Sequence, residues 1–120
     1  MPETSRMALV VLSDADDRLE EAATFVASAA AMDMAVRVLV AGRALARVLG
    51  GGLPTAAAAR LAEARTLGDV RLFACSAALR RAGATRESAL EREPRLFDDV
   101  VGVPAFLAEH LSGAEVQLVF

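Results

Sequence analysis

The chain has 120 residues and a formal net charge of −3 at pH 7, with 55% hydrophobic but only 4% aromatic residues. This length suits one domain with a core of its own. The 13 basic residues are scattered, which argues against nucleic acid as a partner. All of them are arginine, so a P-loop, a Schiff-base lysine and a receiver-type phosphorylation site are excluded.

The apolar segments are too short or too interrupted for a signal peptide or a membrane span. Polar residues 1–6 are followed by only six apolar residues, and the longer stretch 22–40 is broken by polar residues such as Asp33 and Arg37. One cysteine cannot form an intramolecular disulfide. We therefore expect a protein of the reducing cytoplasm, with residues 1–6 as a flexible tail and 7–120 as a single domain.

Apolar runs alternate with helical spacings along the chain. The predicted strands are 7–12, 35–40, 70–74, 98–103 and 114–120, and the predicted helices are 18–32, 43–49, 56–67, 76–82 and 104–111, with a helical turn or loop at 85–88. Ser13 and Asp14 are candidate caps for the first helix, and Pro104 opens the last one. This alternation predicts a three-layer α/β/α domain with a mostly parallel sheet of about five strands.

The first predicted helix carries two apolar stripes. Leu19 and Val26 belong to one stripe, and Phe25 and Met32 belong to the other. A helix that is apolar around so much of its circumference is expected to contact a partner protein as well as the core. We therefore expect a homo-oligomer.

The single cysteine is the main candidate for chemistry. Cys75 follows the buried strand 70–74 and precedes a predicted helix, so it falls where ligands gather in open α/β sheets. The unpaired N–H groups of a first helical turn favour the thiolate. The alternative is a buried core thiol, because free cysteine is among the most buried residue types.

Two further motifs have ordinary structural explanations. Asp14, Asp16 and Asp17 resemble the acidic pocket of a receiver domain, but helix capping and dipole complementarity account for them. The glycines at 50–52 lack the context of a phosphate-binding loop, and helix termination followed by a flexible loop accounts for them. A lid over the Cys75 end of the sheet is the functional alternative.

His110 is the only histidine, and it shares a helical stripe with Phe106. We expect it to be a residue at the edge of the core. A single histidine and a single cysteine cannot form a zinc site within one chain. A catalytic Cys–His pair would require the fold or an oligomer to bring Cys75 and His110 together.

The segments VRLFACSAALRRAGATRESAL (70–90) and DDVVGVPAFLAEHL (98–111) resemble the DsrE/DsrF-like family of small sulfur-relay proteins. In that family a strand ending in Ala-Cys is followed by a short helix, a Gly-containing turn, a charged loop and a Val-Gly segment that opens the last helix. The opening strand, helix and strand also fit, so the resemblance covers nearly the whole domain.

This resemblance implies that Cys75 carries a persulfide sulfur between a donor and an acceptor protein, without cofactor or metal. It also implies assembly as a trimer or hexamer. Two alternatives remain. In one, the chain is a non-catalytic assembly subunit with an inert cysteine, which the apolar residues at 77–79 favour. In the other it binds a small ligand or nucleotide, against which the missing phosphate motifs weigh.

Overall fold

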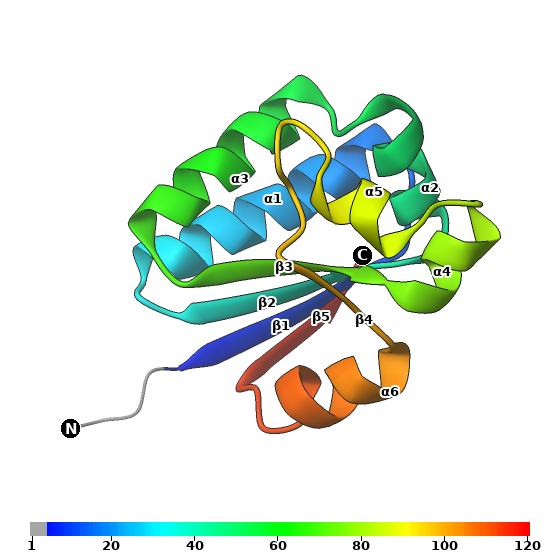
Figure 1. Ribbon diagram of the computed structural model, residues 1–120. Coiled ribbons are helices and arrows are strands. Elements are labelled where there is room, and N and C mark those ends of the chain that lie inside the picture. The colour runs from blue at the N-terminus through cyan, green and yellow to red at the C-terminus, as the bar shows by residue number, and fades with distance from the viewer. Residues whose placement is uncertain (1–4) are drawn as a thin grey trace.

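The computed structural model describes residues 5–120, and it contains a five-stranded, all-parallel sheet with helices on both sides (Figure 1). The strands are β1 (Arg6–Val11), β2 (Ala35–Val40), β3 (Val70–Cys75), β4 (Asp99–Val101) and β5 (Val116–Val119). The helices are α1 (Asp16–Ala31), α2 (Gly42–Gly51), α3 (Thr55–Leu67), α4 (Ser76–Arg81), α5 (Arg86–Leu90) and α6 (Val103–Phe106), which continues as a π-helical turn, η1 (Leu107–Leu111). The predicted three-layer α/β fold is confirmed.

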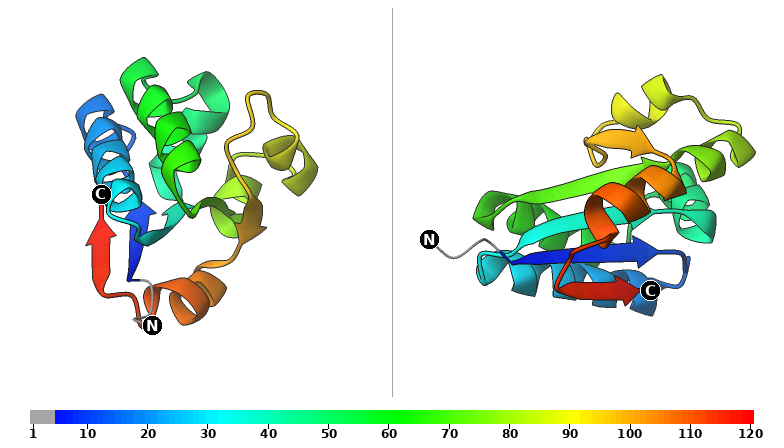
Figure 2. Two further views of the ribbon diagram at one scale, coloured as in Figure 1. Left: turned by 90° about the vertical axis from the view of Figure 1, so that its left-hand side faces the viewer. Right: turned by 90° about the horizontal axis from the view of Figure 1, so that it is seen from below.

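The strands lie in the order β4-β3-β2-β1-β5. Helices α1 and α3 cover one face of the sheet, and α6 with η1 covers the other (Figures 1 and 2). β1, β2 and β3 occupy the middle, where each strand is covered on both faces. This explains why their sequences are nearly continuous apolar runs rather than alternating ones.

The core is built from aliphatic side chains and a few aromatic ones. Its largest fully buried side chains are Phe97, Phe106, Leu9, Leu39, Leu45, Leu72, Val26, Val36 and Val48. Alanines on α1 and α3, such as Ala23 and Ala64, let the two helices lie close to the sheet and to each other. None of the described residues that are buried is polar or charged.

Asp98 holds the short strand β4 in place. Its backbone N–H donates to the Leu72 carbonyl at 2.8 Å, and its carboxylate accepts the Leu72 N–H at 2.8 Å. The same carboxylate pairs with Arg65 of α3 at 3.2 Å. β4 has only three residues, so these contacts supply much of what attaches the segment before it to β3 and α3.

The structure refines three expectations from the sequence. Arg6 begins β1, and the Ser5 carbonyl accepts a hydrogen bond from the Ala35 N–H. Ser5 and Arg6 therefore belong to the sheet region and not to the predicted tail, whose residues 1–4 lie outside the described part of the chain. Ala15, not Ser13 or Asp14, occupies the N-cap of α1.

The last helix also differs from the expectation. It begins at Val103, one residue before Pro104, and widens into a π-helical turn where the Ser112 N–H donates to the Leu107 carbonyl, five residues back. Within residues 5–120, no helix is both long and apolar enough to cross a membrane.

Replacing Phe97 with alanine is expected to lower the free energy of unfolding by about 3–5 kcal/mol, because the ring is fully buried and leaves a cavity. Phe25 provides the matched control, since its side chain is 47% exposed and contacts Phe120 at the surface. Urea denaturation of Phe97→Ala and Phe25→Ala measures both losses. Equal losses would contradict the assignment of Phe97 to the core.

Candidate functional site

Cys75 is the last residue of β3 and the N-cap residue of α4. Its backbone is extended, with φ −71° and ψ 123°, and it lies opposite Val101 at the end of β4. The sequence placed the cysteine at such a strand-to-helix junction, and this placement is confirmed. The carboxyl ends of β3 and β4 therefore meet at the thiol-bearing residue.

The chain leaves these two neighbouring strands toward opposite sides of the sheet. From β3 it passes through α4 to α5, on the side of α1 and α3, whereas from β4 it enters α6 on the other side (Figure 1). Open α/β sheets bind their ligands outside the carboxyl ends of their strands. Cys75 thus stands at the carboxyl end of β3, beside a strand from which the chain leaves on the other side of the sheet.

The turn between β4 and α6 packs against the start of α4. A Cβ atom added at Gly102 would lie 3.6 Å from the Ser76 hydroxyl oxygen, which is ordinary van der Waals contact. Ser76 and Ala77, next to the cysteine, are half-buried. The surface nearest Cys75 therefore consists of the first turn of α4 and the turn that precedes α6.

The thiol itself is inaccessible in the isolated subunit. Cys75 is only 2% exposed. Its side chain accepts no capping hydrogen bond from the first turn of α4, which is only six residues long. The support of a thiolate by that turn, expected from the sequence, stays a prediction.

His110 lies beside Cys75's strand but does not pair with the thiol. Its ring stacks on Phe73, two residues before Cys75 on the same face of β3, with centroids 4.9 Å apart and planes at 20°. The Phe106 ring lies 5.4 Å from the imidazole. Among the described residues no hydrogen bond joins His110 to Cys75, so the catalytic Cys–His pair is not formed.

The surroundings of His110 disfavour its charged form. Partial burial, followed by the positive charges of Arg37, Arg6 and Arg71, lowers its pKa below the usual 6.5. Glu109, 3.9 Å away, acts in the opposite direction but has a smaller effect than burial or Arg37. The neutral form of the imidazole is therefore favoured, and its ring packs against Phe73 of β3.

The acidic and glycine motifs lie at helix ends. Asp16 and Asp17 are in the first turn of α1, as dipole complementarity predicts, but among the described residues no side chain caps that helix. Asp16 pairs with Arg47 of α2 at 2.6 Å, and the same guanidinium donates to the Asp14 carbonyl. α2 ends at Gly51, and Gly52 adopts φ +79°, a conformation that favours glycine. In residues 5–120, no cluster of three or more His, Cys, Asp or Glu side chains has a metal-binding arrangement.

Sequence reasoning missed the role of Asp98, which ties β4 to β3 and so helps to hold Val101 beside Cys75. The pair Asp98-Asp99 was visible at the start of the predicted strand. An acid in front of a short strand is, however, more often a turn residue, and its partners Arg65 and Leu72 are far away in the sequence.

No family model matches the sequence, and no curated protein matches it significantly. Among solved structures, the chain is similar to the conserved protein of unknown function BT1422 from Bacteroides thetaiotaomicron, with a TM-score of 0.61 and 14% sequence identity. The similarity covers 97% of this chain and 95% of the other. At this identity the similarity establishes a shared fold.

The lowered pKa of His110 makes stability depend on pH. The unfolded chain binds the imidazole proton more tightly than the folded one, so stability falls as the pH drops through 6.5 and levels off below the folded pKa. Urea denaturation at about pH 7.5 and about pH 5.5 is expected to show this loss.

The control for this loss is His110→Gln, whose stability is expected to change much less between the two pH values. In the wild-type protein, the ring-proton NMR signals of this single histidine report its pKa directly. A midpoint above 6.5 would contradict the burial of the imidazole against Phe73.

Proposed function

We propose that the chain takes part in intracellular sulfur transfer as a DsrE/DsrF-like sulfur-relay protein, with Cys75 accepting and passing on a persulfide sulfur. The observation that carries the proposal is the position of Cys75 at the carboxyl ends of β3 and β4, because α/β sheets bind their ligands at the carboxyl ends of their strands. The sequence resemblance over 70–111 points to the same residue.

The transfer is a pair of thiol exchanges without net oxidation. The Cys75 thiolate attacks the outer sulfur of a donor protein's persulfide, so a new S–S bond forms on Cys75 while the donor's S–S bond breaks and the donor leaves as a thiolate. An acceptor thiolate then attacks the outer sulfur and releases Cys75. Because the chain has no second cysteine, the persulfide cannot be lost as an intramolecular disulfide.

Transfer requires the thiol to become accessible. With Cys75 2% exposed, a donor can reach the sulfur only if the first turn of α4 or the turn at Gly102 moves. Both are short segments at the carboxyl ends of the strands, and α4 has only six residues. Docking of the donor protein at these strand ends is the step that would expose Cys75.

A free thiol suits a cytoplasmic location, where thiols stay reduced. The proposal includes a homo-oligomer, a trimer or hexamer. Its support is apolar surface on α1 and the edge strand β5, where Phe25, Met32 and Val119 are 47%, 74% and 67% exposed.

Incubation with a persulfide donor tests the proposal. The intact mass of the wild-type protein is expected to rise by about 32 Da, the mass of one sulfur atom, because Cys75 takes up the outer sulfur. Cys75→Ala controls for sulfur bound elsewhere and is expected to keep its mass. Wild-type protein that stays unloaded, or a variant that loads equally, would refute the sulfur-transfer function.

The burial of Cys75 favours a second candidate function, a non-catalytic assembly or interaction subunit in which the cysteine is a core thiol. On this hypothesis the sulfur packs at the end of β3 and never meets a donor. The exposed apolar residues near α1 and β5 would then form the surface through which the protein binds its partners.

Reaction with a chromogenic disulfide reagent separates the two candidates. If Cys75 is inert, the folded protein reacts at least about 100-fold more slowly than the protein in denaturant, because the thiol must wait for unfolding. Addition of a persulfide donor protein would leave this rate unchanged. Rapid reaction of the folded protein would reject the inert role and favour sulfur transfer.

A further inference from the structure

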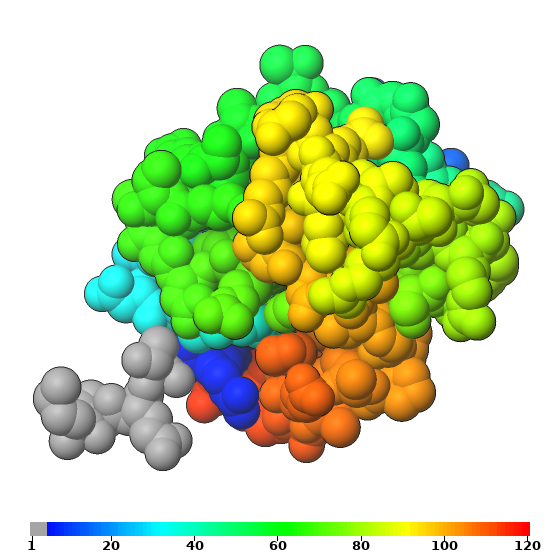
Figure 3. All heavy atoms as spheres, in the orientation of Figure 1, coloured from blue at the N-terminus to red at the C-terminus, as the bar shows by residue number. Residues whose placement is uncertain are grey.

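Three arginines meet in a pocket on the far side of β3 from Cys75. The pocket has a volume of about 220 Å³ and lies between the end of α2, helix α3 and the segment that precedes β4. Its lining includes Arg65 from α3 and Arg92 and Arg95 from that segment, and no acidic residue. Figure 3 shows this segment lying across the surface beside α3.

Most of the donors on these arginines have no acceptor within the described chain. Arg65 donates through one terminal nitrogen to the Leu96 carbonyl and to Asp98, while its buried Nε has no partner. Arg92 donates through one nitrogen to the Leu49 carbonyl, and Arg95 through Nε to the Phe97 carbonyl.

The positive charge of the pocket is only partly neutralised. Asp98 pairs with Arg65, but it is not among the lining residues. Glu91 and Glu93 flank Arg92 in sequence and are exposed, and they do not line the pocket either. The charges of Arg92 and Arg95 therefore remain available to an anion, which a guanidinium binds through paired, charge-assisted hydrogen bonds.

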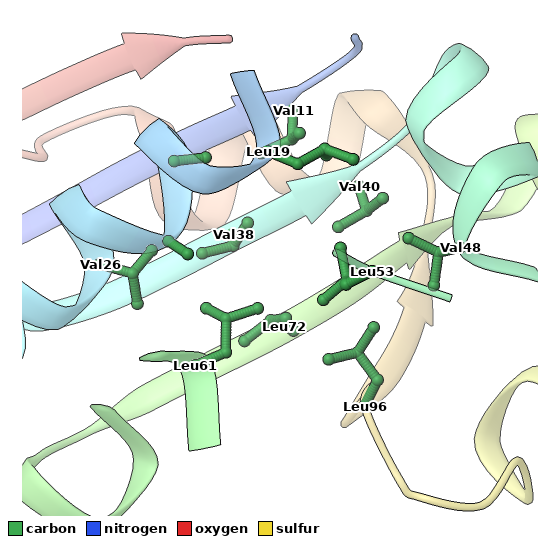
Figure 4. A pocket seen from close by; sticks show the side chains of 12 residues that line it. Val11, Leu19, Val26, Val38, Val40, Val48, Leu53, Leu61, Leu72 and Leu96 are labelled. Atoms are coloured by element: carbon green, nitrogen blue, oxygen red, sulfur yellow. The ribbon is translucent and has the colours of Figure 1, made fainter. Parts of the chain in front are cut away.

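A second, smaller cavity adjoins this pocket. It has a volume of about 30 Å³ and lies under α1 and α3, and Figure 4 shows its aliphatic lining side chains from helices, strands and the segment with Leu96. Val48, Leu53, Leu61 and Leu96 line both spaces. These four side chains form an apolar path from the arginines toward the core.

The two spaces together have the shape and chemistry of a site for an amphiphile. Ligand pockets are mostly apolar, with a few polar groups that orient the ligand. A cavity lined by aliphatic side chains offers water no hydrogen-bonding partner, so it suits an apolar tail. Leu53 and Leu96 are half-buried and lie outside helices and strands, so they are the side chains best able to move aside.

We propose that this pocket binds an anionic amphiphile, a molecule with a carboxylate or phosphate head held by Arg92, Arg95 and Arg65 and a single short apolar tail directed between Leu53, Leu61 and Leu96. Leu72, which lines the inner cavity, and Cys75 lie on opposite faces of β3. The site is therefore separate from the candidate sulfur site, and its occupancy does not depend on thiol chemistry.

Octanoate is the first probe and octyl phosphate is the second. Binding of each is measured by calorimetric titration and by the rise in the melting temperature of the protein. Acetate lacks the tail and 1-octanol lacks the charge, so each is expected to bind at least about tenfold more weakly than octanoate. The comparison of octanoate with octyl phosphate identifies the preferred head group. Backbone NMR shifts are expected at residues 52–65 and 92–96.

The double variant Arg92→Gln/Arg95→Gln removes two charges from the pocket and is expected to weaken octanoate binding at least about tenfold. Arg80→Gln is the matched control, because Arg80 is exposed on α4 and away from the pocket; its affinity is expected to stay within about twofold. Arg95→Lys keeps the charge and is expected to retain part of the affinity, which separates binding from misfolding.

Four results would overturn the proposal. Octanoate and octyl phosphate both failing to bind would remove the site. If octanol and octanoate bind equally well, the arginines do not hold the head group. The same conclusion follows if the double variant and Arg80→Gln bind octanoate with equal affinity. Equal binding of acetate and octanoate would remove the apolar path, leaving only a surface site for anions.

Discussion

The pairing of β4 with β3, secured by Asp98, is the constraint on which both candidate sites depend. β4 is three residues long, and its parallel ladder with β3 is too short to hold an exposed segment by itself. Asp98 bonds both backbone groups of Leu72 and pairs with Arg65. This arrangement places Val101 beside Cys75 and also holds the segment with Arg92 and Arg95 against α3.

β3 separates the molecule into two chemical environments. Because side chains alternate along a strand, Leu72 faces α1 and α3 while Phe73 and Cys75 face α6. The α6 side contains the stack of Phe73, Phe106 and His110, which packs aromatic rings on the same face of β3. The opposite side contains the aliphatic cavity and, at its rim, the arginines.

Much of the fold could be predicted because its signals are local. Residues 35–40 and 70–74 are apolar runs interrupted by a single arginine each, and a strand buried on both faces needs a composition of this kind. Gly68 and Gly83 follow helices as expected. The predictions were less accurate at the ends of elements, as at Ala15 and in the π-helical turn, where a single hydrogen bond decides the boundary.

Composition and periodicity were enough to derive a single three-layer α/β domain with its lone thiol at the junction of β3 and α4. They could not decide the exposure of Cys75, the place of His110 on Phe73, or the gathering of Arg65 with Arg92 and Arg95. Secondary structure follows from neighbours within a few residues. Burial and site geometry depend on contacts between segments tens of residues apart, and only the packing of β4 and its flanking segments against β3 and α3 brings those together.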